Sequence, residues 1–83
     1  MKNKTQLQNM AQELNDTIYL EKIEVEALYD LMRKSDDKET SLDYKEHMLL
    51  AKRELNNDTE NSVYNALYHM NIALQVVGVK LHY

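Results

Sequence analysis

The sequence predicts an all-α protein, and three observations support this prediction. The 83-residue chain contains no proline and a single glycine, so the residues that break helices are almost absent. Apolar residues recur at the three- and four-residue spacing of an amphipathic helix. Two polar clusters interrupt this pattern, and each is followed by residues typical of a helix start. The clusters, at 35–40 and 56–58, divide a single expected domain, residues 1–83, into three helices at about 4–34, 42–55 and 60–80.

The first expected helix is the longest, because one apolar seam stays in register along it. The seam consists of Leu7, Ala11, Leu14, Ile18, Val25, Leu28 and Met32. An alternative arises at Asn15, Asp16 and Thr17, because residues of these types can end one helix and cap the next, which gives four helices. We favour one helix with at most a kink, because the seam continues across this cluster.

The middle helix is expected to be a simple covering helix. Its apolar line consists of Tyr44, Met48, Ala51 and Leu55, and its charged residues lie outside this line. Thr40 to Asp43 fit a capping box, in which a hydroxyl covers free backbone N–H groups and the acid three residues later reaches back.

The last expected helix carries two separate apolar stripes, and this is the most informative feature of the chain. The core-facing stripe consists of Val63, Leu67, Met70, Leu74, Val77 and Leu81. The second stripe, about 100° or more around the helix, contains Tyr64, Tyr68, Ile72 and Val79. The end of the first helix repeats this arrangement with Leu20, Ile23, Ala27 and Leu31.

The second stripe predicts that the chain associates with a partner. The core of a small three-helix domain can bury the first stripe but does not need the second. A chain of this size also gains stability by oligomerisation. We therefore expect an antiparallel long-short-medium arrangement that forms a homodimeric helical bundle. The alternative is that the remaining helix of the same chain packs against the second stripe. The expected oligomer or partner interface consists of Tyr64, Tyr68, Ile72, Val79, Leu20, Ile23 and Leu31.

Residues 77–83 fit two structures. Valine and glycine weaken a helix, and the segment alternates as a strand does. A lone strand would have to pair with the same segment of another chain, which also requires an oligomer. We favour a helix that continues to about Lys80 and then frays.

Charge and composition exclude several classes of protein. The net charge is −4, and the chain has no cysteine for disulfides or thiolate metal sites. The candidate basic patch, formed by Lys34, Lys38, Lys45, Lys52 and Arg53, contains interspersed acids, so nucleic-acid binding is not favoured. No apolar run approaches the roughly 18 residues of a membrane span, and no signal peptide is evident, so we expect a soluble cytoplasmic protein.

No residues form a recognisable catalytic or metal-binding pattern. The three histidines, His47, His69 and His82, lack metal-ligand spacing, and the Asp43–His47 pair is expected to be a surface interaction. The long-short-medium layout resembles the helical chorismate mutases, whose activity requires several cations around a dicarboxylate. This chain has only two arginines, Arg33 and Arg53. We therefore expect no enzyme, no cofactor and no metal.

Tyrosine is the most suggestive residue type for function. The chain has six tyrosines and neither Phe nor Trp, and tyrosine suits interfaces because its ring is large and its hydroxyl tolerates water. We expect a non-enzymatic regulator or inhibitor that docks on another protein. The Asn-, Lys- and Tyr-rich composition resembles the small accessory proteins of phages and AT-rich bacteria.

Two alternative functions remain open. The first is an oligomer that binds a nucleotide or a similar small ligand through Tyr64, Tyr68, Asn65, His69 and Lys80. The second is a small dimeric DNA-binding transcriptional regulator.

Overall fold

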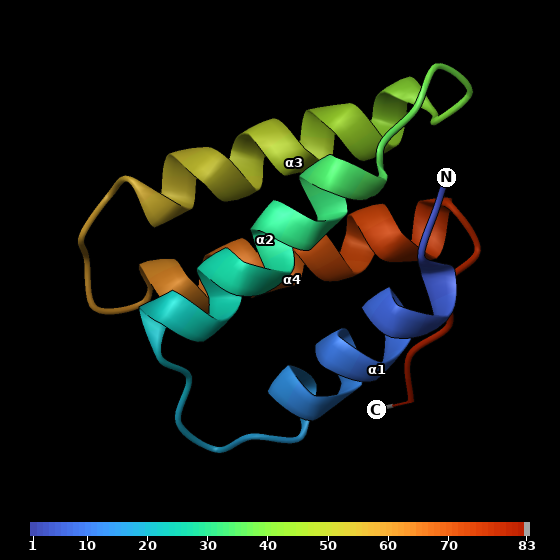
Figure 1. The fold of residues 1–83 in the computed structure, drawn as a ribbon. Coiled ribbons are helices and arrows are strands. Elements are labelled where there is room, and N and C mark those ends of the chain that lie inside the picture. The colour runs from blue at the N-terminus through green and yellow to red at the C-terminus, as the bar shows by residue number, and fades with distance from the viewer. Residues whose placement is uncertain (83) are drawn as a thin grey trace.

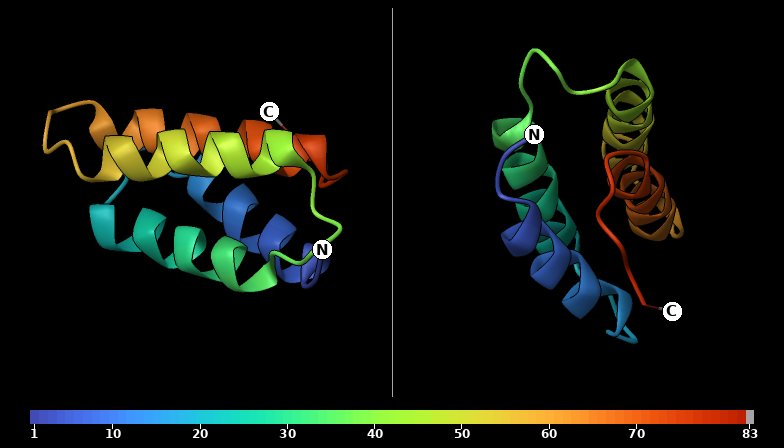
Figure 2. Two further views of the ribbon diagram at one scale, coloured as in Figure 1. Left: turned by 90° about the horizontal axis from the view of Figure 1, so that it is seen from above. Right: turned by 90° about the vertical axis from the view of Figure 1, so that its right-hand side faces the viewer.

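The computed structural model describes residues 1–82 and contains four α-helices in this part of the chain. They are α1 (Lys4–Asn15), α2 (Lys22–Ser35), α3 (Leu42–Leu55) and α4 (Ser62–Val76). Helices α1 and α2 form one layer, and the antiparallel hairpin of α3 and α4 forms the other (Figures 1 and 2). The all-α prediction is confirmed, and the prediction of three helices is wrong.

The predicted long helix is broken at the polar cluster that follows Leu14. The Asn15 amide donates to the Ala11 carbonyl at 2.7 Å, and the Thr17 hydroxyl donates to the Glu13 carbonyl at 2.8 Å. Such local side-chain bonds compete with continued helix formation. The chain then forms a loop, in which Ile18 is 81% exposed instead of lying in the seam. The three-helix layout, on which the resemblance to chorismate mutases depended, is therefore absent.

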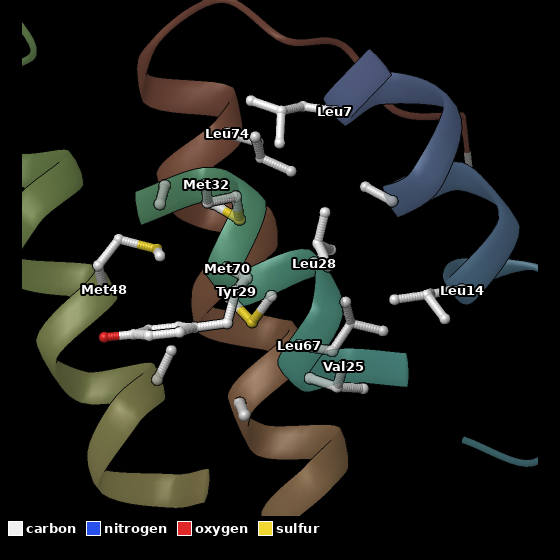
Figure 3. Packing of buried hydrophobic residues seen from close by; sticks show 14 of the residues in the cluster. Leu7, Leu14, Val25, Leu28, Tyr29, Met32, Met48, Leu67, Met70 and Leu74 are labelled. Atoms are coloured by element: carbon white, nitrogen blue, oxygen red, sulfur yellow. The ribbon is translucent and has the colours of Figure 1, made fainter. Parts of the chain in front are cut away.

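The apolar core lies between the two layers, as Figure 3 shows. The buried side chains there come from all four helices and include Leu7, Leu14, Val25, Leu28, Met32, Met48, Leu67, Met70 and Leu74. Each large apolar side chain that is fully buried stabilises the fold by about 1.5–3 kcal/mol. The seams predicted for α1, α2 and α4 thus face one common core, although Val63, Val77 and Leu81 are only partly buried.

The most extensive contact between two helices joins α3 to α4. Small side chains lie in the core there, because Ala51, Ala66 and Ala73 are all fully buried. Small residues allow two helix axes to approach closely. The apolar line predicted for α3 is confirmed, since all four of its residues are buried.

Tyr44 connects α3 to α2 through the core. Its side chain is fully buried, and its hydroxyl donates to the Met32 carbonyl at 3.0 Å. Burial raises the pKa of Tyr44 above its usual value, so the hydroxyl stays protonated and remains a donor.

Helix α3 begins one residue later than a cap by Thr40 would require. The Ser41 hydroxyl accepts a hydrogen bond from the Tyr44 N–H at 3.3 Å and is the N-cap. The Thr40 hydroxyl instead donates to the Asp37 carboxylate at 3.1 Å. Thr40 therefore stabilises the α2–α3 loop.

Helix α4 ends at Val76 in a Schellman motif. Gly78 has a φ of 86°, its N–H donates to the Gln75 carbonyl at 3.0 Å, and the Val79 N–H donates to the Leu74 carbonyl at 2.9 Å. Val79 and Leu74 are both buried, which completes the apolar contact that accompanies this motif. The predicted continuation of the helix to Lys80 is wrong, because the glycine reverses the chain direction.

The segment after the Schellman motif runs along α1 of the same chain (Figure 2). The Gln8 amide donates to the Lys80 carbonyl at 2.8 Å. The Gln12 amide donates to the His82 carbonyl at 2.7 Å and accepts from the His82 N–H at 2.8 Å. Two glutamines one helical turn apart therefore form the hydrogen bonds of the tail backbone. In the strand alternative, the same segment of another chain would have formed them. Tyr83 lies outside the described residues.

The N-terminal segment is attached to the end of α2 and the loop that follows. The Met1 amino group lies 2.9 Å from the Asp37 carboxylate, and the Lys2 N–H donates to the Ser35 carbonyl at 3.0 Å. The hydrogen bond from the amino group is the main cause that lowers the pKa of Asp37 from its usual value of 3.8 to about 2.

The positive φ of Gly78 predicts the effect of a substitution. Gly78→Ala should lower the free energy of unfolding by about 1 kcal/mol, because a left-handed conformation is unfavourable for an L-residue. Space is not limiting, since the nearest atom to an added Cβ is the Lys4 Nζ at 3.9 Å. Urea unfolding followed by circular dichroism measures the loss. Gly78→Asn should lose less than Gly78→Ala, and equal losses would contradict this explanation.

The lowered pKa of Asp37 predicts a pH-dependent stabilisation. A carboxyl whose pKa is depressed in the folded state stabilises the fold above its unfolded pKa, and this contribution disappears as the pH falls towards about 2. Asp37→Asn should therefore be less stable than the parent chain at neutral pH, and the difference should disappear as the pH falls through about 2. Urea midpoints across this pH range test the prediction. Glu39→Gln, a neighbouring exposed acid, is the control and should show a smaller difference at neutral pH.

Candidate functional site

Helix α4 has an outer strip that no other helix covers. None of its 15 residues is Asp, Glu, Lys or Arg. Its core face is buried, but Tyr68 is 63% exposed, Tyr64 is 44% exposed and Asn65 is also exposed. Depletion of charge together with tyrosine and asparagine is typical of surfaces that bind other proteins.

The α1–α2 loop extends this strip. The Leu20 N–H donates to the Tyr64 hydroxyl at 3.4 Å, and the Tyr64 hydroxyl lies 3.4 Å from the Ile18 carbonyl, to which it donates. Tyr64 thereby holds the loop against α4. Ile18 and Tyr19 are 81% and 82% exposed. We refer to Ile18, Tyr19, Leu20, Tyr64 and Tyr68 together as the loop–α4 surface.

A hollow of about 220 Å³ lies within this surface, between α1 and α4. It is lined by Leu14, Asn15, Thr17, Leu20, Tyr64, Leu67, Tyr68 and Asn71. Asn15 and Asn71 form a reciprocal pair, in which each amide donates to the other carbonyl, at 3.0 and 2.8 Å. The pair satisfies both side chains, and the rest of the lining is mainly apolar and aromatic.

The size of the hollow favours a side chain over a free ligand. Pockets for small molecules are usually about 300–1,000 Å³, larger than this one. An apolar side chain of a partner protein, seated between Tyr64 and Tyr68, is the kind of anchor on which interface affinity often depends.

An ion pair fixes the start of α2 beside this surface. The Lys22 Nζ lies 2.8 Å from the Asp58 carboxylate in the α3–α4 loop. The hydrogen bond between them raises the pKa of Lys22 and lowers the pKa of Asp58, so both groups are charged at neutral pH. The two charges compensate each other.

The residues predicted to form an interface have different environments. Tyr64, Tyr68 and Ile23 are exposed, whereas Leu20, Leu31 and Ile72 are half-buried. Val79 is only 3% exposed, because the Schellman motif turns it into the core, so the second stripe does not reach it. The structure brings Leu20, Tyr64 and Tyr68 together around the hollow. It places Ile23 and Leu31 on α2, outside the hollow lining.

The residues predicted to bind a small ligand do not form one site. Lys80 follows the C-terminal end of α4, where its carbonyl accepts from the Gln8 amide, whereas Tyr64 lies in the first turn of α4. His69 is half-buried and stacks on His47 of α3, with ring centroids 6.0 Å apart. Asn65 is exposed and lines neither this contact nor the hollow.

The predicted basic patch is divided. Lys38 and Lys45 lie near Arg33, Asp36 and Asp37, whereas Lys52 and Arg53 are in the last turn of α3. Among residues 1–82, no cluster of three or more His, Cys, Asp or Glu has the arrangement of a metal site. No helix in the described part of the chain is long and apolar enough to cross a membrane.

Ile18 and Tyr19 were not predicted to be site residues. Sequence reasoning placed Ile18 in the core seam because it assumed a continuous helix. The polar cluster immediately before Ile18 was the available signal, since a helix break there exposes both residues. Comparison with protein-family models, curated proteins and solved structures finds no match to this chain.

Tyr64→Phe tests how the loop is held. Loss of the hydroxyl should leave the Leu20 N–H without its partner and speed its hydrogen exchange, with little effect on global stability because the site is exposed. Amide exchange measured by NMR gives the result. Tyr68→Phe is the matched control, and a similar increase in that variant would contradict the role assigned to Tyr64.

Proposed function

We propose that this chain is a small non-enzymatic interaction protein that regulates or inhibits another protein by docking on it through the loop–α4 surface. The observation that carries the proposal is the exposure of Ile18 and Tyr19 in the α1–α2 loop next to Tyr64 and Tyr68, which line a mainly apolar hollow. Contiguous exposed apolar side chains of this kind mark surfaces that bind partners. Each square ångström of apolar surface removed from water contributes about 25 cal/mol to binding, so a partner that covers these side chains gains affinity.

The way in which the surface is held also supports docking. Tyr64 fixes the loop through two backbone groups, and the Lys22–Asp58 ion pair fixes the adjoining start of α2. A preorganised surface loses less conformational entropy when it binds, so more of the contact energy is retained as affinity. The biological setting that we propose, an accessory protein of phage type, rests on the small size and the composition of the chain.

Self-association through the same surface is the second candidate. Tyr64 and Tyr68 belong to the stripe that predicted a homodimer, and both remain exposed. Leu20, Leu31 and Val79 of the same predicted interface contact the core of their own chain. The apolar surface left for a dimer is therefore smaller than a continuous two-stripe helix would offer, which is why we place docking on a different protein first.

Site-specific photo-crosslinking tests the proposal directly. A photoreactive phenylalanine replaces Tyr68 in one variant and Leu49, a 65% exposed residue of α3, in a matched control. Irradiation in cells that produce the chain should give a discrete heterologous adduct from position 68 and not from position 49.

The mass of the adduct separates the two candidates. An adduct of twice the 9.8 kDa chain mass would favour the homodimer. Identical adducts from both positions would contradict a specific role for the loop–α4 surface. In a further variant the photoreactive residue is at position 19, and adding Tyr68→Asp should abolish its heterologous adduct. The helical circular dichroism signal should be retained, because Tyr68 is exposed and its loss leaves the core intact.

A further inference from the structure

The charged residues that border the loop–α4 surface are acidic. Asp16 and Glu21 lie at the two ends of the α1–α2 loop, and Glu60 lies in the turn just before the start of α4. All three are exposed. We refer to Asp16, Glu21 and Glu60 as the acidic rim.

Among residues 1–82, none of the three rim carboxylates forms an ion pair. Between residues 13 and 26 the only Lys or Arg is Lys22, and between residues 56 and 79 there is none. Lys22 is already paired with Asp58 at 2.8 Å. The acidic rim therefore presents an uncompensated negative charge around an apolar surface.

The acidic character continues along the neighbouring groove. A hollow of about 200 Å³ between α1 and α2 is lined by Met10, Glu13, Leu14, Glu24 and Ala27. Leu14 lines this hollow and the hollow between α1 and α4, so the two adjoin. A partner that extended beyond the first hollow would meet two further carboxylates.

We infer that the loop–α4 surface binds a basic segment of another protein, in which an apolar side chain is flanked by Lys or Arg. This inference rests on the proposed function and names the class of its partner. The apolar side chain enters the hollow beside Tyr64 and Tyr68, and the cations face the acidic rim. Complementary charge at the rim of an interface accelerates association and suppresses wrong partners.

The same charges disfavour the other occupants. A second copy placed symmetrically on this surface would bring one acidic rim against another, because a two-fold interface pairs a patch with itself. Nucleic acid would place phosphates against carboxylates. A basic protein segment is the occupant that satisfies both the apolar hollow and its rim.

Two synthetic peptides provide the probe. Both are fluorescein-labelled amphipathic helices with the same pattern of leucines on the apolar face. The polar face carries only lysine in one peptide and only glutamate in the other. Fluorescence anisotropy with the full chain should detect binding of the leucine–lysine peptide, weakened by added salt, and little binding of the leucine–glutamate peptide.

Neutralising the rim tests the charge contribution. Asp16→Asn/Glu21→Gln should weaken binding of the leucine–lysine peptide by about fivefold, as expected for two exposed charges. The asparagine keeps an oxygen acceptor for the Gln12 amide, which lies 3.1 Å from the Asp16 carboxylate. Glu39→Gln/Glu46→Gln is the matched control, because it changes net charge equally at exposed positions away from this surface and should leave the affinity unchanged. Glu60→Gln provides an independent test of the rim outside the α1–α2 loop and should also weaken binding of the leucine–lysine peptide.

The apolar contribution is tested separately. Tyr68→Ser should weaken binding of the leucine–lysine peptide by about tenfold or more, the loss typical of a central interface tyrosine. Leu49→Ser is its control and should have no effect.

The outcomes distinguish this inference from the proposed function. If both peptides bind equally tightly and Tyr68→Ser weakens both, the docking surface stands and the inference of a basic partner is overturned. If Tyr68→Ser changes the affinity of neither peptide, the loop–α4 surface is not the docking site and both proposals fail. Equal weakening by the rim variant and by its matched control would show a general charge effect, which also overturns the inference.

Discussion

The close contact of α3 with α4 is the interaction on which the rest of the structure depends. Fully buried alanines occur on both helices, Ala51 on α3 and Ala66 and Ala73 on α4, and small residues allow helices to pack closely. On another side of α4, Leu67, Met70 and Leu74 face the common core with α1 and α2 (Figure 3). Helix α4 is thus covered on most of its circumference, and only a narrow strip remains in contact with solvent.

The two ends of α4 determine how α1 is attached. At the C-terminal end, the Schellman motif at Gly78 directs the tail onto Gln8 and Gln12. Near the N-terminal end, Tyr64 binds the loop that follows α1, and between the two ends Asn71 pairs with Asn15. These contacts are polar and specific, and they set the position of α1 relative to α4. The hollow of the loop–α4 surface follows from this arrangement, because it lies where α1 ends and the loop begins.

Local sequence patterns predicted much of the fold. The bounds of α3 agree with the expected range 42–55, and the seams of α1, α2 and α4 identified most of the core. The break after Asn15 was not favoured, because the apolar seam continues in register across it. Two separate helices that face one core can show the same continuous spacing when the loop between them has a suitable length. The end of α4 depends on the left-handed conformation of Gly78, and spacing alone does not distinguish a glycine within a helix from one that ends it.

The candidate site was less predictable because the exposure of several of its residues depends on tertiary contacts. Tyr64 and Tyr68 were identified from the second stripe, since their exposure depends mainly on their position around one helix. Val79 was misplaced because its environment depends on the turn that precedes it. Ile18 and Tyr19 were missed because their exposure depends on a loop that Tyr64 holds from 44 or more residues away in the sequence. Contacts of this range leave no periodic signal in the chain.

In this account, the four helices of one chain bury a common core, and the exposed loop–α4 surface is open to a different protein. The acidic rim makes pairing of this surface with itself unfavourable. The absolute mass in solution, measured by light scattering over a wide range of concentration, tests this claim most directly. We predict a constant mass near the 9.8 kDa of one chain. A constant mass of twice that value, with Tyr68 protected from solvent, would contradict the account.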